Sequence, residues 1–299
     1  MRKNLIFPDF RFNRLPYSSA HHNRNTLPLM TVKKPADIEG AIAAADRTVE
    51  IHNRLAVWLK PGVTLAHIDT FIAKTLSDLS SISAFIKYKT GHYPPFPSHS
   101  CLSLNDTVVH GTAGMSIEPL KPGDIISIDI GVKHKGWIGD AAWTYAIQTI
   151  SDNARKLCEC GKKSINLGIE QLQPGAPLIR WAETVQDFVE GECGFSLVRG
   201  LGGHGYGRTL HAPPFISNVR PLSRLEWPDA NYALRPGDLI AVEPMIAEGS
   251  PELIQHPKRW PIKTADGQLA VHFEHDVLIT ETGPRVLTRE LNDLPLIVG

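Results

Sequence analysis

Four carboxylates stand in segments of the chain that otherwise suit buried β-strands: Asp129, Asp140, Glu243 and Glu274. The apolar segments around them cover residues 125–132, 137–147, 239–246 and 269–280. Any one of these carboxylates could be a solvated strand residue, but four of them favour a shared buried site. Clustered carboxylates cannot all stay ionised without cations, because loss of hydration and like charges raise their pKa values. Two divalent cations would balance four carboxylates, and the sequence therefore predicts a paired metal site.

A neutral histidine would complete such a site, since oxygen ligands with one or two imidazoles suit Mn, Fe, Co or Zn. His204 lies in the run Gly-Gly-His-Gly-Tyr-Gly, residues 202–207, where glycine lets the backbone approach a crowded site. Such a run could also be only a turn. It lacks the strand, helix and acidic partner of a dinucleotide-binding fingerprint, which we therefore do not expect. His211 follows seven residues later, and His110 lies in the turn-like segment 105–114, where it could be structural.

Two of the carboxylates should meet in a β-hairpin. In residues 125–132, Ile and Val alternate with Ser127, Asp129 and Gly131, which places Asp129 on the face opposite the aliphatic side chains. Only a short Lys-His-Lys-Gly turn region separates this strand from the next apolar strand, which carries Asp140. Antiparallel pairing across that turn would bring the two aspartates together.

The chain also contains an internal repeat. The turn and strand at 120–129 reappear at 234–243 with the same residue character, an offset of 114 positions. Each copy follows two predicted helices that are joined at a Pro-Gly break: 36–59 and 64–76, then 151–167 and 178–189. The sequence thus predicts a duplicated helix-helix-strand unit, with halves at about 35–150 and 151–290 around a pseudo-twofold axis. Asp129 and Glu243, which end the two copies, would then be equivalent residues.

Composition limits the remaining classes. The chain has 299 residues with 31 basic and 31 acidic side chains, a balance that argues against direct nucleic-acid or membrane-surface binding. A hydrophobic content of 42% is typical of a globular protein, and no apolar stretch is long enough to span a bilayer. Pro8 precedes any signal-peptide core, and four cysteines are too few for a disulfide framework. We therefore expect a cytoplasmic protein with an extended or disordered arm, 1–34, and one folded domain, 35–299.

Taken in order, the polar positions resemble those of type I methionine aminopeptidases over about residues 35–290. The matching residues are His110-Gly111, Asp129, Asp140, Gly203-His204-Gly205 with His211, Glu243-Pro244-Met245 and Phe273-Glu274-His275. The resemblance implies the α/β (α+β) pita-bread fold, in which two pseudo-twofold-related halves share a central, curved, mostly antiparallel sheet with helices on the outside. It also implies a metallo-exopeptidase that removes the N-terminal methionine from nascent proteins and peptides.

The same resemblance implies two divalent metal ions, whose identity among Co, Mn, Fe, Zn and Ni stays open. Five residues would bind them: Asp129, Asp140, His204, Glu243 and Glu274. In this arrangement Asp140 and Glu274 bridge the two ions. Asp129 completes the shell of one ion, and His204 with Glu243 completes the shell of the other.

The resemblance further assigns catalytic roles. A metal-bound hydroxide would attack the carbonyl carbon of the first peptide bond. Glu243 would take the proton of the water and return it to the leaving amine. His211 would donate to the carbonyl oxygen as negative charge grows there, and His110 would contact the peptide nitrogen or the second residue.

Family members select methionine with a narrow apolar pocket, whose positions match Cys101, Trp260, Tyr93 and Phe96. From the residues alone, Cys101 could equally be a small buried hydrophobe, and Trp260, in the Pro-flanked loop 257–261, could equally serve packing. The sequence departs from the family at Leu210, where an aromatic is common, and at Ala212, where a glutamate is frequent. These departures bear on pocket shape and second-residue preference.

Two other functions stay open at this stage. Xaa-Pro peptidases share the fold and the metals, although they commonly carry a full extra domain where this chain has a short N-terminal region. An inactive pita-bread binding module would be expected to have lost ligands, and all five are present. As partners we expect N-terminal peptide substrates of nascent chains and no membrane, with a monomeric protein; ribosome association would suit cotranslational methionine removal.

Overall fold

The computed structural model describes residues 31–91 and 93–299. The arm expected over residues 1–34 therefore lies outside the described residues, except for its last four positions. Thr31 forms an isolated bridge with Asp238, and the Val32 N–H donates to the Gly237 carbonyl oxygen at 2.8 Å. The described end of the arm is thus hydrogen-bonded to the turn before β9 (Leu239–Val242).

Four α-helices form where the apolar periodicity predicts them: α1 (Pro35–Trp58), α2 (Leu65–Asp78), α3 (Asp152–Ile169) and α4 (Ile179–Gln186). The hydroxyl of Thr64 accepts the His67 N–H at 3.2 Å, so Thr64 is the N-cap of α2. A π-helical turn, Asp187–Glu192, continues α4, and two 3-10 helices cover Pro228–Asn231 and Arg289–Asp293. None of the described helices is long and apolar enough to cross a membrane.

Two five-stranded sheets make up most of the β-structure. In the first, the strand order is β1-β4-β5-β16 with β2 paired to β4: β1 (Ile82–Ser83), β2 (Cys101–Leu104), β4 (Ile125–His134), β5 (Trp137–Ile147) and β16 (Ile297–Val298). In the second, the order is β15-β14-β9-β7-β8: β15 (Gly283–Val286), β14 (His275–Thr280), β9, β7 (Gly202–Gly205) and β8 (Ala212–Ser217). Within these sheets only the pair β5 and β16 is parallel. The sheets are therefore mostly antiparallel, as predicted.

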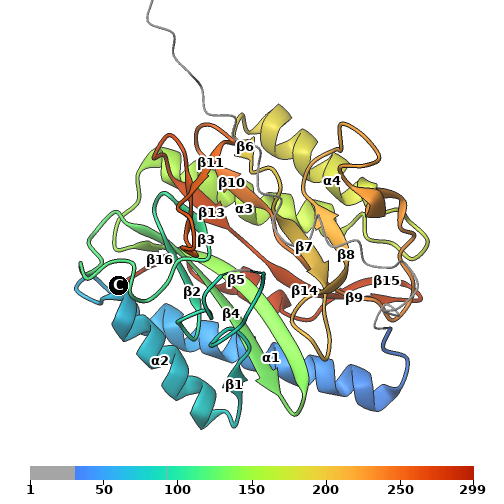
Figure 1. Ribbon diagram of the computed structural model, residues 1–299, viewed down its shortest axis with the longest axis horizontal. Coiled ribbons are helices and arrows are strands. Elements are labelled where there is room, and N and C mark those ends of the chain that lie inside the picture. The colour runs from blue at the N-terminus through green and yellow to red at the C-terminus, as the bar shows by residue number, and fades with distance from the viewer. Residues whose placement is uncertain (1–30, 92) are drawn as a thin grey trace, which may run out of the picture.

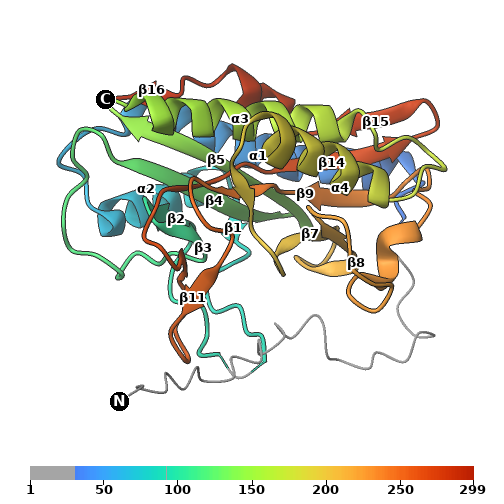
Figure 2. The ribbon, with the colours of Figure 1, turned by 90° about the horizontal axis from the view of Figure 1, so that it is seen from above.

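Two three-stranded sheets complete the fold. One has the order β13-β10-β6: β13 (Ala270–His272), β10 (Met245–Ala247) and β6 (Ser196–Leu197). The other has the order β11-β12-β3: β11 (Leu253–Gln255), β12 (Ile262–Thr264) and β3 (Thr107–Val109). In Figure 1, α1 and α2 lie beside one part of the sheets, and α3 and α4 lie beside the other. In Figure 2, α1 and α3 run along one side of the strands, while the segment that carries β11 projects from the opposite side.

The two copies of the repeat make the same backbone contacts. The Gly62 N–H donates to the Leu120 carbonyl oxygen at 2.8 Å, and the Gly175 N–H donates to the Leu234 carbonyl oxygen at 2.7 Å. Each contact ties the Pro-Gly break between two helices to the turn before a strand, β4 in the first copy and β9 in the second. The duplicated unit inferred from the sequence thus reappears as duplicated structure, and the exact limits of its halves stay a prediction.

Two segments predicted as continuous strands are each interrupted in the structure, so the prediction of a single strand is wrong for both. The segment 239–246 divides into β9 and β10 at Glu243-Pro244, where proline has no N–H to donate to a ladder. The segment 269–280 divides into β13 and β14 at Phe273-Glu274. Since β9 pairs with β14 and β10 pairs with β13, the chain changes sheets at each of these two glutamates.

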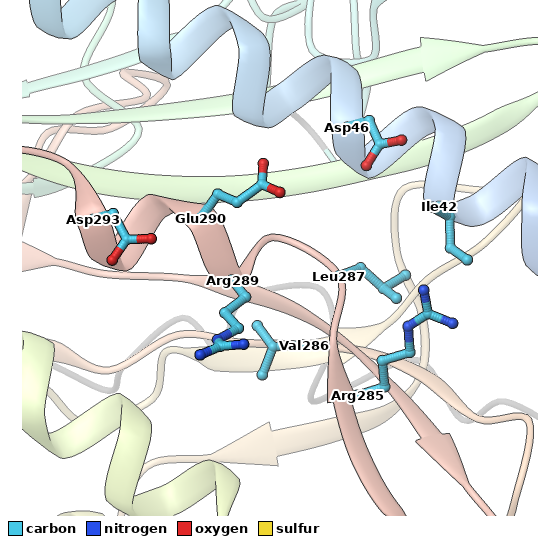
Figure 3. Close-up of a pocket in the computed structure, with 8 residues that line it drawn as sticks. All are labelled: Ile42, Asp46, Arg285, Val286, Leu287, Arg289, Glu290 and Asp293. Carbon is cyan, nitrogen blue, oxygen red and sulfur yellow. The ribbon is translucent and has the colours of Figure 1, made fainter.

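A hollow lies between α1, β15 and the 3-10 helix that follows it (Figure 3). Charged side chains of both signs line it: Asp46, Arg285, Arg289, Glu290 and Asp293. None of the residues that line this hollow belongs to the predicted site.

Candidate metal centre

The two aspartates meet across the β4–β5 hairpin, as predicted. In this ladder Asp129 stands opposite Ala142, and Asp140 stands opposite Gly131. The two aspartates are therefore diagonal neighbours on one face of the sheet, where side chains come within reach of each other. Gly131 has no side chain, and the Phe85 ring occupies the space that a Cβ at this position would need.

The two glutamates arrive from the second half of the chain. Glu243 directly follows β9 and Glu274 directly precedes β14, and these strands are paired in one sheet. The Glu274 N–H donates to the Ala142 carbonyl oxygen on β5 at 2.9 Å, which joins this sheet to the hairpin. The points where the chain changes sheets thus place both glutamates beside the two aspartates.

His204 completes the cluster from β7. Its Nε2 lies 3.6 Å from Glu243 Oε1 and 3.9 Å from Asp140 Oδ2. Its Nδ1 lies 3.0 Å from the Gly205 carbonyl oxygen, which can only accept, so Nδ1 carries the hydrogen. The lone pair on Nε2 is then directed at the carboxylates, as in a metal-ligating histidine whose other nitrogen bonds a carbonyl.

The glycines beside His204 are required by neighbouring backbone. A Cβ at Gly203 would lie 2.2 Å from the Ala241 carbonyl oxygen, and a Cβ at Gly205 would lie 2.1 Å from the Pro213 carbonyl oxygen. Both distances are too short for any side chain. The close approach inferred from the glycine run is therefore an approach of β9 and of the start of β8 to β7.

The carboxylates of the cluster are hard to ionise together without a positive partner. Loss of hydration raises the pKa of Asp140 to about 7. Burial, with repulsion from the neighbouring carboxylates, raises the pKa values of Asp129, Glu243 and Glu274 well above their usual range. In the described part of the chain, the ion pairs of Asp140, Glu243 and Glu274 come only from histidines. Burial lowers the pKa of His204 to about 4, so this histidine is neutral at pH 7 and compensates no charge.

The donor set fits divalent metal ions. Among the described residues, Asp129 Oδ1 and Asp140 Oδ1 are buried without a hydrogen-bond partner. Ligand atoms lie within 4.8 Å of one another in two groups of three: Asp140, His204 and Glu274; Glu243, His272 and Glu274. Carboxylate oxygens and neutral imidazole suit Mn, Fe, Co and Zn, and such ions would supply the missing charge. The five predicted ligands are therefore brought together, and an unforeseen histidine lies among them.

His272 was missed by the sequence reasoning. Its Nε2 lies 3.3 Å from Glu243 Oε2 and 4.0 Å from Glu274 Oε2. Burial, with a smaller contribution from His110, lowers the pKa of His272 to about 3. A signal was present, since His272 stands two positions before Glu274 and an extended chain directs alternate side chains to one face. The strand is interrupted at Phe273-Glu274, so strict alternation of side chains does not hold there. The motif Phe273-Glu274-His275 contains His275 and not His272.

His275 and Asp276 directly follow Glu274, and their side chains bond groups other than the four carboxylates. The ring of His275 bonds the Thr288 hydroxyl at 2.9 Å and lies 3.1 Å from Asn292 Nδ2, so it is held away from the carboxylates. Asp276 Oδ2 accepts the Asp140 N–H at 2.9 Å. Asp276, also missed from the sequence, thus fixes the backbone that carries Asp140, and burial raises its own pKa well above the usual value.

Two further histidines stand at the opening of the site. The ring of His211 lies 4.4 Å from that of His204, and its Nδ1 lies 2.7 Å from the Tyr88 hydroxyl. Burial, and then the proximity of His204 and His110, holds the pKa of His211 well below its ordinary value. His110 adopts a φ of 58°, in the left-handed region that non-glycine residues rarely occupy, and burial lowers its pKa to about 4. Tyr88 had no signal in the sequence, because 123 positions separate it from His211.

The four predicted pocket residues also come together. The Trp260 ring packs against Tyr93 at 5.1 Å, against Phe96 at 5.2 Å and against His110 at 6.0 Å, measured between ring centroids. The Trp260 N–H donates to the Pro94 carbonyl oxygen at 2.9 Å, which fixes the plane of the indole. Cys101 stands opposite Asp129 in the β2–β4 ladder and belongs to the same apolar cluster as Phe96 and Trp260. An apolar wall thus lies directly beside the carboxylates.

Comparison with known proteins agrees with this geometry. Residues 39–281 match the profile of Metallopeptidase family M24. "Methionine aminopeptidase 1" of Bacillus subtilis (strain 168) is 37% identical over 262 residues, which cover 87% of this chain and 100% of that protein. The crystal structure of methionine aminopeptidase from Rickettsia prowazekii superposes with a TM-score of 0.79 at 29% identity, over 87% of this chain and 100% of that chain. The protein belongs to metallopeptidase family M24. Within that family it falls among the methionine aminopeptidases.

More distant relatives share the fold alone. The X-Pro aminopeptidase from Thermotoga maritima MSB8 superposes with a TM-score of 0.66 at 18% identity, over 90% of this chain and 63% of that longer chain. The pita-bread architecture expected from the sequence is thus confirmed, and it is common to peptidases of different specificity.

Proposed function

We propose that this protein is a metal-dependent aminopeptidase that removes the N-terminal methionine from peptides and nascent proteins. The observation that carries the proposal is the convergence of three buried carboxylates, the half-buried Asp129 and a neutral histidine beside an apolar pocket. Carboxylates at this density need cations, and a pocket of this kind suits an unbranched apolar side chain such as methionine. Membership of the methionine aminopeptidases supports the same activity.

We propose two ions in this centre, with Asp140 and Glu274 shared between them. Asp129 would serve one ion, and His204 with Glu243 would serve the other. When bound, the ions would polarise the scissile carbonyl and lower the pKa of the attacking water. The donor atoms suit Co, Mn, Fe, Zn and Ni alike, so the residues do not select one metal.

Glu243 is the proposed proton carrier. It is 9% exposed, against 3% for Asp140 and 2% for Glu274. Its pKa is raised by burial, which suits a group that accepts a proton from water and returns it to an amine.

His211 and His110 would orient the substrate. If the Tyr88 hydroxyl donates to His211 Nδ1, the hydrogen of the neutral ring lies on Nε2, the nitrogen that would meet the carbonyl oxygen of the scissile bond. A donor already aimed at the developing negative charge lowers the barrier without reorganisation. His110, packed against Trp260, would contact the peptide nitrogen or the second residue.

Cys101, Tyr93, Phe96 and Trp260 are the proposed walls of the methionine pocket. The Tyr93 hydroxyl donates to Gln255 Oε1 at 2.9 Å, which holds the Tyr93 ring against Trp260. The small Cys101 side chain would leave depth beside Asp129 for a long substrate side chain. Rigid aromatic walls favour a flexible thioether over branched or charged side chains.

Peptide hydrolysis tests the proposal. The protein would be stripped with a chelator, reloaded with Mn, Fe or Co, and given Met-Ala-Ser or an Xaa-Pro peptide. We expect release of methionine from Met-Ala-Ser only after metal is added. Cleavage of the Xaa-Pro peptide alone would indicate the alternative peptidase, and metal-dependent cleavage of neither would indicate a binding module.

The cellular setting follows from this role. We propose that the protein acts in the cytoplasm as a monomer on N-terminal peptides of nascent chains, and that it associates with ribosomes. None of the four cysteines forms a disulfide, as expected in a reducing compartment. Cosedimentation with ribosomes at rising salt would test the association.

A further inference from the structure

We infer that His272 is a further metal ligand, so that the centre offers two imidazoles to the pair of ions rather than one. The inference deepens the proposed function and rests on it, because it assumes that ions occupy the carboxylate cluster. It concerns the group of possible ligands that contains Glu243 and Glu274, whereas His204 is grouped with Asp140 and Glu274.

The distances around His272 match those between ligands of one ion. Two bonds of about 2.0–2.1 Å that meet at a tetrahedral angle separate their donor atoms by about 3.3–3.4 Å. His272 Nε2 lies 3.3 Å from Glu243 Oε2. Its distance to Glu274 Oε2 is 4.0 Å, and all three ligand atoms fall within 4.8 Å of one another. Nε2 therefore faces the same space as the two carboxylate oxygens.

No hydrogen bond among the described residues accounts for the position of His272 Nε2. His272 is 2% exposed, and its Nε2 is buried without a hydrogen-bond partner among the described residues. A buried polar atom without a partner is unfavourable, because it has lost its hydration and gained no hydrogen bond in return. An ion between Nε2 and the two carboxylates would provide a partner.

Neighbouring strands fix the backbone at His272. The His272 N–H donates to both Ser127 Oγ at 3.1 Å and Thr144 Oγ1 at 3.2 Å, and the Thr144 hydroxyl donates to the His272 carbonyl oxygen at 2.9 Å. His272 is also paired with Met245 in the β10–β13 ladder. These contacts come from β4, β5 and β10, so three strands fix the backbone from which the His272 ring extends.

The two groups of three ligands share one residue. Asp140, His204 and Glu274 form the first group, and Glu243, His272 and Glu274 form the second. Each group contains one imidazole, and Glu274 links the two. A second imidazole should favour Zn, Fe or Co over Mn at the second group, because imidazole suits the former metals and carboxylate suits Mn.

A matched pair of variants tests the assignment. His272→Gln removes the imidazole and keeps a polar side chain, and His134→Gln makes the same change where the ring bonds the Ser81 hydroxyl. We expect His272→Gln to weaken binding of one of two Co²⁺ equivalents at least about tenfold in calorimetry, the smallest effect usual for disturbing a metal site. The visible absorption of bound Co²⁺ should change, Mn²⁺ affinity should fall less, and His134→Gln should alter none of these.

X-ray absorption on the unmodified protein provides a test that does not depend on folding of a variant. With two equivalents of Zn²⁺, we expect imidazole scattering that corresponds to one histidine per ion. One histidine for two ions, or an unchanged Co²⁺ affinity and spectrum in folded His272→Gln, would overturn the inference. Cleavage of Met-Ala-Ser by the unmodified protein would then still support the proposed function. Conversely, two histidine-ligated ions without cleavage would uphold the ligand and reject the activity.

Discussion

At the scale of single residues, the centre depends on groups whose charge state differs from that in water. Asp140 has a pKa raised to about 7, and His204 has a pKa lowered to about 4, both through burial. Both shifts favour the neutral form and make the cluster costly to ionise without cations. The residues that should act on the substrate, His211 and His110, stand outside this cluster and can be altered without removing a ligand.

His211→Ala should lower kcat for Met-Ala-Ser by roughly a hundredfold or more, the usual effect of losing one donor to the developing oxyanion. Metal content, measured by atomic emission, should stay at the wild-type value. Tyr88→Phe should have a smaller effect, because it removes only the hydroxyl that fixes the His211 ring. Loss of metal from His211→Ala would show that the assigned role is wrong.

Asp140→Asn should weaken metal binding when metal is present. In the metal-free protein it should change how the free energy of unfolding depends on pH. With metal, the variant should bind fewer ions, because a shared carboxylate is lost. Without metal, the raised pKa of Asp140 means that the folded state keeps a proton which the unfolded chain releases above about pH 4. That contribution is complete below about pH 4 and is lost as the pH rises towards 7.

The metal-free wild type should therefore lose stability relative to metal-free Asp140→Asn between about pH 4 and pH 7. Histidines titrate in both proteins, so the comparison by urea unfolding removes their contribution to first order. A stability difference that does not change with pH, or unchanged binding of both ions by the variant in calorimetry, would contradict the role given to Asp140.

At the scale of secondary-structure elements, the site is made where strands pair and where strands end. The β4–β5 hairpin fixes the two aspartates by its register. The glutamates lie where the chain leaves one sheet for another, at Glu243-Pro244 and at Phe273-Glu274. His204 depends on β7 lying close to β9, which only glycine neighbours permit.

Gly203→Ala should destabilise the protein by about 2 kcal/mol or more, because its Cβ would meet the Ala241 carbonyl oxygen and force backbone movement. Displacement of β7 should also weaken metal binding through His204. Gly114→Ala is the matched control, since nothing lies within 4 Å of the Cβ it would introduce. Equal urea midpoints for the two variants would contradict this view of the glycine run.

Much of this arrangement could be predicted from the sequence, and the remainder has a physical reason. The hairpin was predictable because a short turn leaves one way to pair two apolar strands. The interruptions at Glu243 and Phe273-Glu274 were missed, because an apolar run does not reveal which sheet each part joins. His272 and Asp276 were missed because their contacts, to Glu243 and to Asp140, depend on that change of sheet.

At the scale of the whole molecule, the two halves repeat the same construction. Asp124 accepts the Lys121 N–H at 2.9 Å in the turn before β4, and Asp238 accepts the Arg235 N–H at 2.9 Å in the turn before β9. Buried apolar residues from both halves form one continuous core. The offset of 114 positions could be seen in the sequence, but the shared core could not, because it depends on how the halves pack.

Asp124→Ala and Asp238→Ala should therefore each lower the free energy of unfolding by about 2 kcal/mol, since each removes an acceptor from two hydrogen bonds. Because the core is shared, both variants should unfold in a single transition followed by circular dichroism and by tryptophan fluorescence. Two separate transitions in either variant would mean that the halves fold independently.

The presence of two ions among the convergent carboxylates is tested most directly by anomalous scattering from crystals soaked in Co²⁺ or Mn²⁺. We expect two anomalous peaks in contact with Asp129, Asp140, Glu243 and Glu274. No peak at these side chains at saturating metal, or peaks only elsewhere on the molecule, would contradict the metal centre and the activity proposed from it.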